Sequence, residues 1–303
     1  MHIGKIASLL KKFGIAFTEN ADTSMLTSMR CGGYAAALAE PCTAEELITL
    51  VRLLRSEKIK FRVIGAMTNT LPYGGFYDGV LIRTLRINRL EFTDNNTVIA
   101  ETGATLRAIV TQAMRRGLGG IEAISGIPGS IGGAVYGNAG ANGLSISDAL
   151  VGAEAYDIAS DSIISLSCGE LSFDYRDSIF KMRRDLIILR AEFRLTEMEE
   201  REISLRVAEY TEKRRASQPL SFPSLGSIFK HPTGDFAPRL IESLGLKGCS
   251  VGGAAISDIH AGFIVNLGEA TTEDVLELIN QIKCKVKKAY GIMLEEEINI
   301  LRE

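Results

Sequence analysis

The chain of 303 residues is long enough for two or three domains with a well-buried core. Hydrophobic residues make up 46% and charged residues 23% of it, a composition typical of a globular protein rather than a disordered or fibrous one. The formal net charge of −3 gives no indication of a general affinity for nucleic acid or for an anionic membrane surface.

Cysteine and histidine are too scattered to indicate a disulfide framework or a metal site. The 5 cysteines form an odd set without a closely spaced pair, and the 3 histidines share no metal-ligand spacing. No apolar run approaches the roughly 20 residues that cross a bilayer. Residues 1–17 are amphipathic, which favours a first helix over a secretion signal. We expect a cytoplasmic, monomeric protein that binds no metal, nucleic acid or membrane.

The first clear elements of the chain are a helix and a strand that runs into glycine. Thr43 and Glu46 have the spacing of a capping box, and leucine and valine then recur at helical intervals. Residues 60–64 (KFRVI) predict a strand followed at once by Gly65. Further expected elements are strands over 80–83 and 97–101, and a helix over 106–116 that ends at Gly117.

The second half predicts strands first and helices later. Two prolines between Gln218 and Pro223 mark a change in composition, and we place a domain boundary near residue 197. The expected elements are strands over 151–158, 162–166 and 186–195, a charged helix over 200–215, a helix over 237–244, strands near 253–256 and 263–265, a helix over 271–290 and a last strand over 297–301.

The order of these elements predicts an α+β fold, because helices and strands do not alternate cleanly enough for a doubly wound sheet. We expect a larger ligand-binding region, 1–196, built of two subdomains that meet near residues 65–80. A smaller α/β domain, 197–303, follows it. In the long helix of the tail, helical spacing predicts a buried face made of Leu276, Ile279, Ile282 and Val286.

Glycine is concentrated in the window Gly117–Gly143, which holds 10 of the 30 glycines. Its centre, GIPGSIGG, has neither the spacing of a Rossmann loop nor the lysine of a P-loop. Such a turn would leave backbone amides and the Ser130 hydroxyl free for a phosphate or pyrophosphate. A second loop, Gly65–Asn69, follows a strand, and the two loops together would suit both ends of a dinucleotide. A plain surface loop is the alternative reading of the glycine cluster.

Six motifs, in order along nearly the whole chain, resemble the UDP-N-acetylenolpyruvoylglucosamine reductase family in its shorter type without a long insertion. Each motif is weak alone, and their joint order makes the resemblance specific. They are Thr27–Gly33 (TSMRCGG), Gly126–Gly133 with Asn138–Gly140, Phe173–Ser178 (FDYRDS), Gln218–Lys230 (QP…PSLGSIFK), Gly252–Asn266 and Gly291–Ile298 (GIMLEEEI).

The resemblance implies an FAD-binding domain of the vanillyl-alcohol-oxidase (PCMH) type in 1–196. It also implies a substrate-binding domain in 197–303, whose last strand returns to the active site. The implied reaction uses FAD as cofactor and NADPH as reductant, and reduces UDP-N-acetylglucosamine enolpyruvate to UDP-N-acetylmuramate for peptidoglycan, cell-wall growth and cell division. The expected FAD-binding residues are Gly65, Ala66, Met67, Thr68, Asn69, Gly126, Ile127, Pro128, Gly129, Ser130, Gly132, Gly133, Asn138, Ala139 and Gly140.

The three catalytic positions of the family match Arg176, Ser227 and Glu297. Arg176 would hold the substrate carboxylate and stabilise the charge that spreads into it. Ser227 would donate a proton, and Glu297 would polarise the carboxylate from the other side. Because side chains alternate along a strand, Glu296 is expected to face away from Glu297. The residues expected to bind the uridine diphosphate are Tyr175, Arg214 and Lys230.

The first phosphate loop departs from the family at Met67, which stands where a glycine is usual. If that position needs φ > 0, methionine costs about 1–2 kcal/mol or reshapes the loop. Two alternatives therefore stay open: a divergent paralogue that reduces another enolpyruvyl or nucleotide-sugar substrate, and a non-catalytic nucleotide-sugar-binding protein. The presence of Arg176, Ser227 and Glu297 favours an enzyme. His260 is expected to be structural, through a backbone hydrogen bond.

Overall fold

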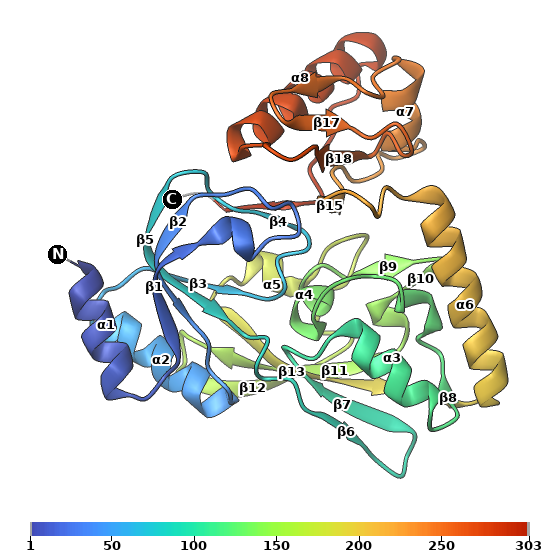
Figure 1. Cartoon of the computed structure of the whole chain (residues 1–303). Coiled ribbons are helices and arrows are strands. Elements are labelled where there is room, and N and C mark those ends of the chain that lie inside the picture. The colour runs from blue at the N-terminus through green and yellow to red at the C-terminus, as the bar shows by residue number, and fades with distance from the viewer. Residues whose placement is uncertain (1, 302–303) are drawn as a thin grey trace.

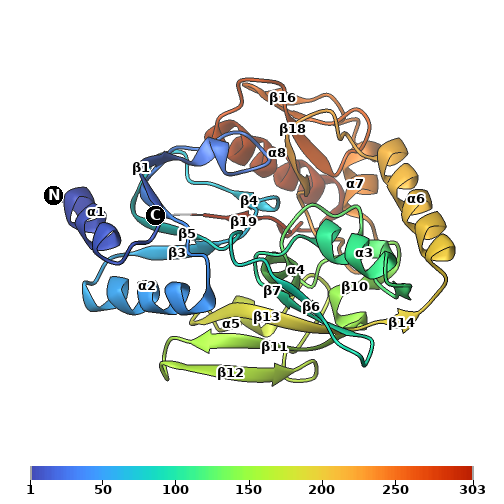
Figure 2. The same cartoon turned by 60° about the horizontal axis from the view of Figure 1, so that its bottom comes forward.

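A four-stranded sheet with two helices on one face begins the fold (Figures 1 and 2). The computed structural model describes residues 2–301. The strand order is β1-β2-β5-β3, with β1 antiparallel to β2 and the other neighbours parallel. The elements are α1 (His2–Lys12), β1 (Phe17–Asp22), a 3-10 turn η1 (Thr23–Met25), β2 (Tyr34–Ala39), α2 (Ala44–Ser56), β3 (Phe61–Ile64) and β5 (Phe76–Arg83).

Local sequence explains why α2 begins where it does. The Thr43 hydroxyl accepts a hydrogen bond from the Glu46 amide at 3.1 Å, and the Glu46 carboxylate reaches back to the Cys42 amide at 2.7 Å. The leucines and valine at helical spacing are fully buried against the sheet. The predicted Thr43 cap is therefore formed, but Glu46 accepts from the Cys42 amide instead of the Thr43 amide that completes a capping box.

A five-stranded antiparallel sheet forms the middle of the molecule, in the order β12-β11-β13-β7-β6. Helices α3 and α4 share the core of this sheet. The elements are β6 (Leu90–Phe92), β7 (Thr97–Glu101), α3 (Leu106–Met114), β8 (Leu118–Gly119), η2 (Glu122–Ile124), α4 (Ile131–Tyr136), β9 (Gly140–Ala141), β10 (Leu144–Ser145), η3 (Ile146–Asp148), β11 (Leu150–Asp157), β12 (Ser162–Ser167), α5 (Ile179–Met182), β13 (Leu186–Arg194) and β14 (Thr196–Glu197).

The third part, orange to red in Figure 1, is a small antiparallel sheet in the order β15-β18-β17-β16, packed against α7 and α8. Helix α6 (Glu200–Ser217) leads to it along one side of the molecule (Figure 1). The other elements are β15 (Ser224–Ser227), α7 (Ala237–Ser243), β16 (Ser250–Val251), β17 (Ala254–Ile256), β18 (Phe263–Asn266) and α8 (Thr272–Tyr290).

The buried face of α8 differs slightly from the predicted one. Ile279, Ile282 and Val286 are buried as expected, but Val275 and Leu278 complete the face, and Leu276 is only partly buried. The reason is geometric, because Leu276 lies at the margin of the apolar stripe, where the helix turns toward solvent.

The end of the chain returns to the first part of the fold. Strand β19 (Asn299–Ile300) pairs in parallel with β4 (Thr70–Leu71), which follows the Gly65–Asn69 loop. The last strand was predicted to begin at Glu297, but regular pairing starts only at Asn299. Before it, Glu296 forms an isolated bridge with Phe229 of the third part. The segment before β19 thus joins two sheets, which is why it is not a continuous strand.

Two predicted boundaries need correction. The first sheet includes β5 up to Arg83 and the second begins with β6 at Leu90, so the division between them falls after residues 65–80. Helix α6 packs against η2 and α3 of the middle part, with Ile203 buried and Val207 in that core. This packing moves the start of the third part from residue 197 to the loop that follows Ser217.

The mixed α+β class and the predicted helices and strands are otherwise confirmed, with ends that shift by a few residues. All five cysteines are free thiols. Among residues 2–301, no helix is long and apolar enough to cross a membrane, and no cluster of His, Cys, Asp and Glu could hold a metal ion. His260 accepts a hydrogen bond at Nδ1 from the Gly262 amide at 3.1 Å, the backbone role predicted for it.

Candidate active site

Arg176 is the meeting point of the candidate site. Its Nε donates to the Glu297 carboxylate at 3.0 Å, and its terminal nitrogens donate to the carbonyls of Gly140 at 2.7 Å and Asn138 at 3.4 Å. The side chains of Arg176 and Glu297 are only 23% and 17% exposed, so the pair is partly shielded from water. The site thus joins the glycine-rich window to a carboxylate from the end of the chain.

The backbone at Glu297 connects this pair to Ser227. The Glu297 amide donates to the carbonyl of Ile228 at 2.8 Å, and its own carbonyl accepts from the Asn69 side chain at 3.1 Å. Ser227 directly precedes Ile228 at the end of β15, where the pairing with β18 shifts register. Such a bulge re-aims side chains. The three predicted catalytic residues therefore come from elements that are hydrogen-bonded to one another.

The three consecutive acids diverge as predicted. Glu296 pairs with Lys283 of α8 at 2.8 Å, whereas Glu297 pairs with Arg176. Glu295 forms an ion pair with Lys230 at 2.6 Å. Glu295 and Glu297 thus contact cations of the candidate site, and Glu296 is used in the packing of α8. Alternation along an extended segment explains this arrangement even though regular pairing begins later.

The residues predicted to bind the uridine diphosphate occupy two places. Tyr175 and Lys230 lie by the Arg176–Glu297 pair: the Tyr175 ring stacks on His231 at 6.2 Å between centroids, and His231 meets Phe236 edge-on at 5.2 Å. Arg214 instead packs against the glycine-rich window. A Cβ atom added to Gly126 would lie 3.0 Å from the Arg214 Cδ. Burial lowers the pKa of the Arg214 guanidinium, and within residues 2–301 it has no ion pair.

The two glycine-containing loops lie against each other, as the dinucleotide hypothesis requires. The Thr68 hydroxyl donates to the Pro128 carbonyl at 2.8 Å. A Cβ on Gly65 would approach the Ser130 hydroxyl to 2.6 Å, closer than real Cβ contacts, so glycine is required there for packing. Met67 has φ +49°, which shows that the loop keeps the left-handed conformation that a glycine would favour.

The free donors of the window differ from those expected. The amides of Ile131 and Gly132 donate to backbone carbonyls at 2.8 Å, and the Gly133 amide donates to the Ser130 hydroxyl at 3.4 Å. The Ser130 hydroxyl is buried, and its oxygen accepts this bond as the N-cap of α4. Its proton is not donated to any of the described residues. Within the loop 126–133, the amides that donate to none of the described residues are those of Gly126, Gly129 and Ser130.

The chemistry of the window fits an FAD. The Ser125 hydroxyl and the Gln218 side-chain oxygen are buried without a hydrogen-bond partner among residues 2–301. Ser125 adjoins Gly126, and Gln218 follows the last turn of α6, which carries Arg214 against Gly126. Buried polar atoms without partners are rare and call for a ligand or a water. Together with the free amides, they suit a group with phosphate oxygens and a polar ring.

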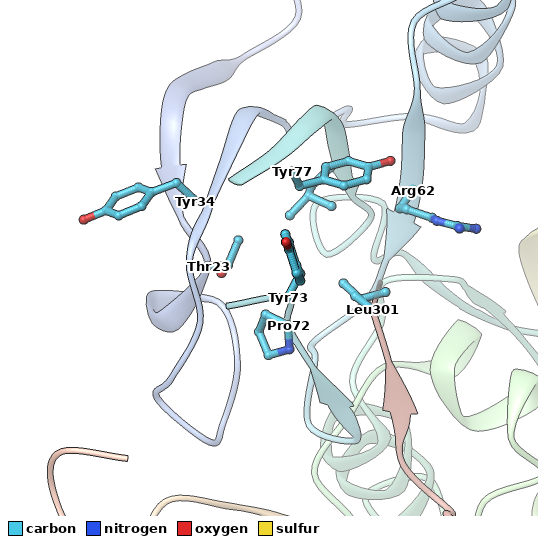
Figure 3. Close-up of a pocket in the computed structure, with 8 residues that line it drawn as sticks. Thr23, Tyr34, Arg62, Pro72, Tyr73, Tyr77 and Leu301 are labelled. Carbon is cyan, nitrogen blue, oxygen red and sulfur yellow. The ribbon is translucent and has the colours of Figure 1, made fainter. Parts of the chain in front are cut away.

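A small cavity lies elsewhere, on the face of the first sheet opposite α1 and α2 (Figure 3). In Figure 3, Tyr73 lies between Thr23 and Leu301, with Tyr77 above it and Pro72 below it. None of the three predicted catalytic residues lines it. Its lining residues are Thr23, Tyr34, Arg62, Pro72, Tyr73, Tyr77, Leu81 and Leu301.

Sequence reasoning missed two contributors to the site. Lys181 donates from its side chain to the Arg176 carbonyl, and the Asn69 side chain holds Glu297 from the opposite loop. Lys181 lies three residues after the Phe173–Ser178 motif, and no signal in the sequence indicates its contact with Arg176. Asn69 was predicted only as a phosphate-loop residue, because nothing local indicates its pairing with the end of the chain.

A Met67→Gly variant tests how much the methionine in the Gly65–Asn69 loop contributes to stability. It is only 4% exposed and packs in an apolar cluster with Ile64 and Tyr77. Replacing Met67 by glycine relieves left-handed strain of about 1–2 kcal/mol but removes a buried side chain worth about 2–5 kcal/mol. We expect the free energy of unfolding to fall by about 1–3 kcal/mol, measured by urea denaturation. The exposed Met25, changed to alanine, is the control, and a stabilised Met67→Gly variant would contradict the prediction.

Comparison with known proteins assigns the family. Residues 35–167 match the model of an FAD-binding domain, and residues 218–301 match that of the C-terminal domain of UDP-N-acetylenolpyruvoylglucosamine reductase. A relative named UDP-N-acetylenolpyruvoylglucosamine reductase, from Fervidobacterium nodosum, is 41% identical over 297 residues, covering 98% of this chain and 95% of the relative.

Solved structures agree with this assignment. The reductase from Thermus caldophilus superposes with a TM-score of 0.79 and 32% identity, covering 95% of this chain and 99% of that one. A solvent-stable cholesterol oxidase shares only the fold of the FAD-binding part, with a TM-score of 0.50 and 18% identity over 61% of this chain and 38% of its own. The fold is thus the vanillyl-alcohol-oxidase type with an added C-terminal domain, and the chain belongs to the UDP-N-acetylenolpyruvoylglucosamine reductase family.

Proposed function

We propose that this protein is an FAD-dependent oxidoreductase that reduces UDP-N-acetylglucosamine enolpyruvate to UDP-N-acetylmuramate with NADPH, a step of peptidoglycan precursor synthesis. The observation that carries the proposal is the Arg176–Glu297 pair, which adjoins Ser227 and the glycine-rich window. Family membership supports the same conclusion. We further propose that it acts in the cytoplasm as a monomer and contributes to cell shape and division.

The proposed residues have distinct tasks in the reaction. FAD held by the two glycine-containing loops and reduced by NADPH would supply a hydride to the vinyl carbon distal to the substrate carboxylate. Arg176 binds that carboxylate through two nitrogens and stabilises the negative charge as it spreads from the adjacent carbon. Ser227 donates a proton to this carbon, and Glu297 keeps the guanidinium oriented and borders the carboxylate.

We propose that the cofactor is held by the two loops 65–69 and 126–133, with residues 138–140 closing the site. The contact between Thr68 and Pro128 and the free amides of Gly126, Gly129 and Ser130 support this assignment. The uridine diphosphate would lie toward Tyr175 and Lys230, where an aromatic face and a cation are available. In this arrangement Arg214 lies with the cofactor and not with the uridine diphosphate, because it packs on Gly126.

The packing also supports a division of the chain into a cofactor-binding part and a substrate-binding part. The first ends with α6 and the second begins after Ser217, with its last strand returned to β4. Met67 has the positive φ that a glycine would favour at this position, so the backbone conformation of the phosphate loop is retained, which favours the flavoenzyme over a binding protein that has lost FAD. A paralogue with another acceptor would share the same site and differs only in its substrate.

The test separates the two half-reactions. The protein is purified with added FAD, reduced anaerobically with NADPH, and mixed with UDP-N-acetylglucosamine enolpyruvate while the flavin absorbance is followed. We expect bleaching by NADPH and rapid return of the oxidised spectrum with the substrate. A flavin that is reduced but not reoxidised would indicate a paralogue with another acceptor. Failure to bind FAD at all would exclude the enzyme.

A further inference from the structure

Arg176 occupies an unfavourable backbone conformation at the tip of a tight hairpin. Asp174 and Asp177 exchange backbone hydrogen bonds of 3.1 and 3.3 Å, so that only Tyr175 and Arg176 form the turn. Arg176 has φ +55°. In turns that need a positive φ at the third residue, glycine or asparagine is favoured, because a larger side chain crowds the backbone there. Such residues persist only where their surroundings hold them in place.

The residue that holds the backbone of Arg176 is Lys181. Its side-chain nitrogen, carried by α5, donates a hydrogen bond to the Arg176 carbonyl, and this is its only side-chain hydrogen bond within residues 2–301. Charge-assisted bonds of this kind are stronger and shorter than those between neutral groups. The partly buried ammonium also faces Asp177, Glu295 and Glu297 as opposite charges and Lys230 as a like charge, and burial lowers the pKa of Lys181.

We propose that Lys181 is a positioning residue, which locks the Arg176 peptide in its left-handed turn and so aims the guanidinium at Glu297 and at the substrate carboxylate. The proposal rests on the role proposed for Arg176 above. Without this bond, the turn can relax to negative φ, and the guanidinium at the end of the side chain moves with it. Displacements of about 1 Å in such a group can cost about 100-fold in rate.

A double-mutant cycle tests the coupling. Lys181→Met keeps the aliphatic stem and removes the donor, and we expect kcat/KM for the enolpyruvyl substrate to fall about 10- to 100-fold while the FAD content stays the same. In an Arg176→Gln background, the same change should add little, because the guanidinium to be positioned is gone. Lys181→Gln retains a donor and should recover part of the activity. Additive effects in the cycle would overturn the proposal.

A matched control and a structural measurement complete the test. Lys247→Met removes a lysine that pairs with Glu242 away from the site, and it should leave kcat/KM unchanged. In a crystal structure of Lys181→Met, we expect Arg176 to leave positive φ and its Nε to separate from Glu297. If the turn and the 3.0 Å contact persist, Lys181 does not position Arg176. The crystal structure of Lys181→Met does not depend on activity, so it distinguishes failure of this inference from failure of the proposed function.

Discussion

An Arg176→Met variant is expected to lose about 10³-fold in kcat/KM for the enolpyruvyl substrate, which corresponds to about 4 kcal/mol of transition-state stabilisation. Arg176 is the only described cation in contact with Glu297, and its guanidinium can hold a carboxylate through two parallel bonds. Because the negative charge grows in the transition state, most of the loss should lie in kcat rather than in KM. Steady-state kinetics of substrate-dependent NADPH oxidation measure both values.

The control for this variant is Arg215→Met on the same protein. Arg215 lies at the end of α6 and faces Glu212 at 3.9 Å, with both side chains about 70% exposed, so the pair contributes little. We expect its kinetics to be those of the parent. The Arg176→Met variant should still be folded and still bind FAD, which its flavin spectrum reports. A loss of less than about tenfold would remove Arg176 from the chemical step.

The second large effect is expected at Ser227. In a Ser227→Ala variant, kcat should fall about 10²- to 10⁴-fold, the usual contribution of a positioned proton donor. The Ser227 hydroxyl forms no hydrogen bond with residues 2–301, so it is free to face a substrate. Gly226 before it has φ +79°, a conformation that only glycine adopts readily. Reduction of the flavin by NADPH should remain, because no proton from Ser227 enters that half-reaction.

Stopped-flow absorbance distinguishes the two half-reactions of the Ser227→Ala variant. We expect NADPH to bleach the flavin at the parent rate, and the substrate to restore its absorbance far more slowly. Ser224→Ala, at the start of the same strand, is the matched control and should change neither rate. Equal slowing of both half-reactions would point to a damaged flavin site instead of a lost proton donor.

The local elements of this protein were predictable because their signals are contained in a few neighbouring residues. Strand β7 was predicted with its observed ends, 97–101, from β-branched residues between polar ones. Helix α8 begins where Thr271 and Asp274 cap each other's amides, and it ends at Gly291 with φ +73°. The family resemblance also depends on short motifs, so the trio Arg176, Ser227 and Glu297 could be named without coordinates.

The geometry of the site could not be predicted, because its bonds join residues that are distant in the sequence. Arg176 and Glu297 are 121 positions apart, and Asn69 holds Glu297 across 228 positions. The Ser130 oxygen caps α4, a role that depends on where the helix starts and that the sequence reading did not include. By itself the sequence determined the elements and indicated the candidate catalytic residues. Only tertiary packing decided which amides stay free, where Arg214 lies and how Lys181 holds Arg176, because these depend on long-range contacts with no local signature.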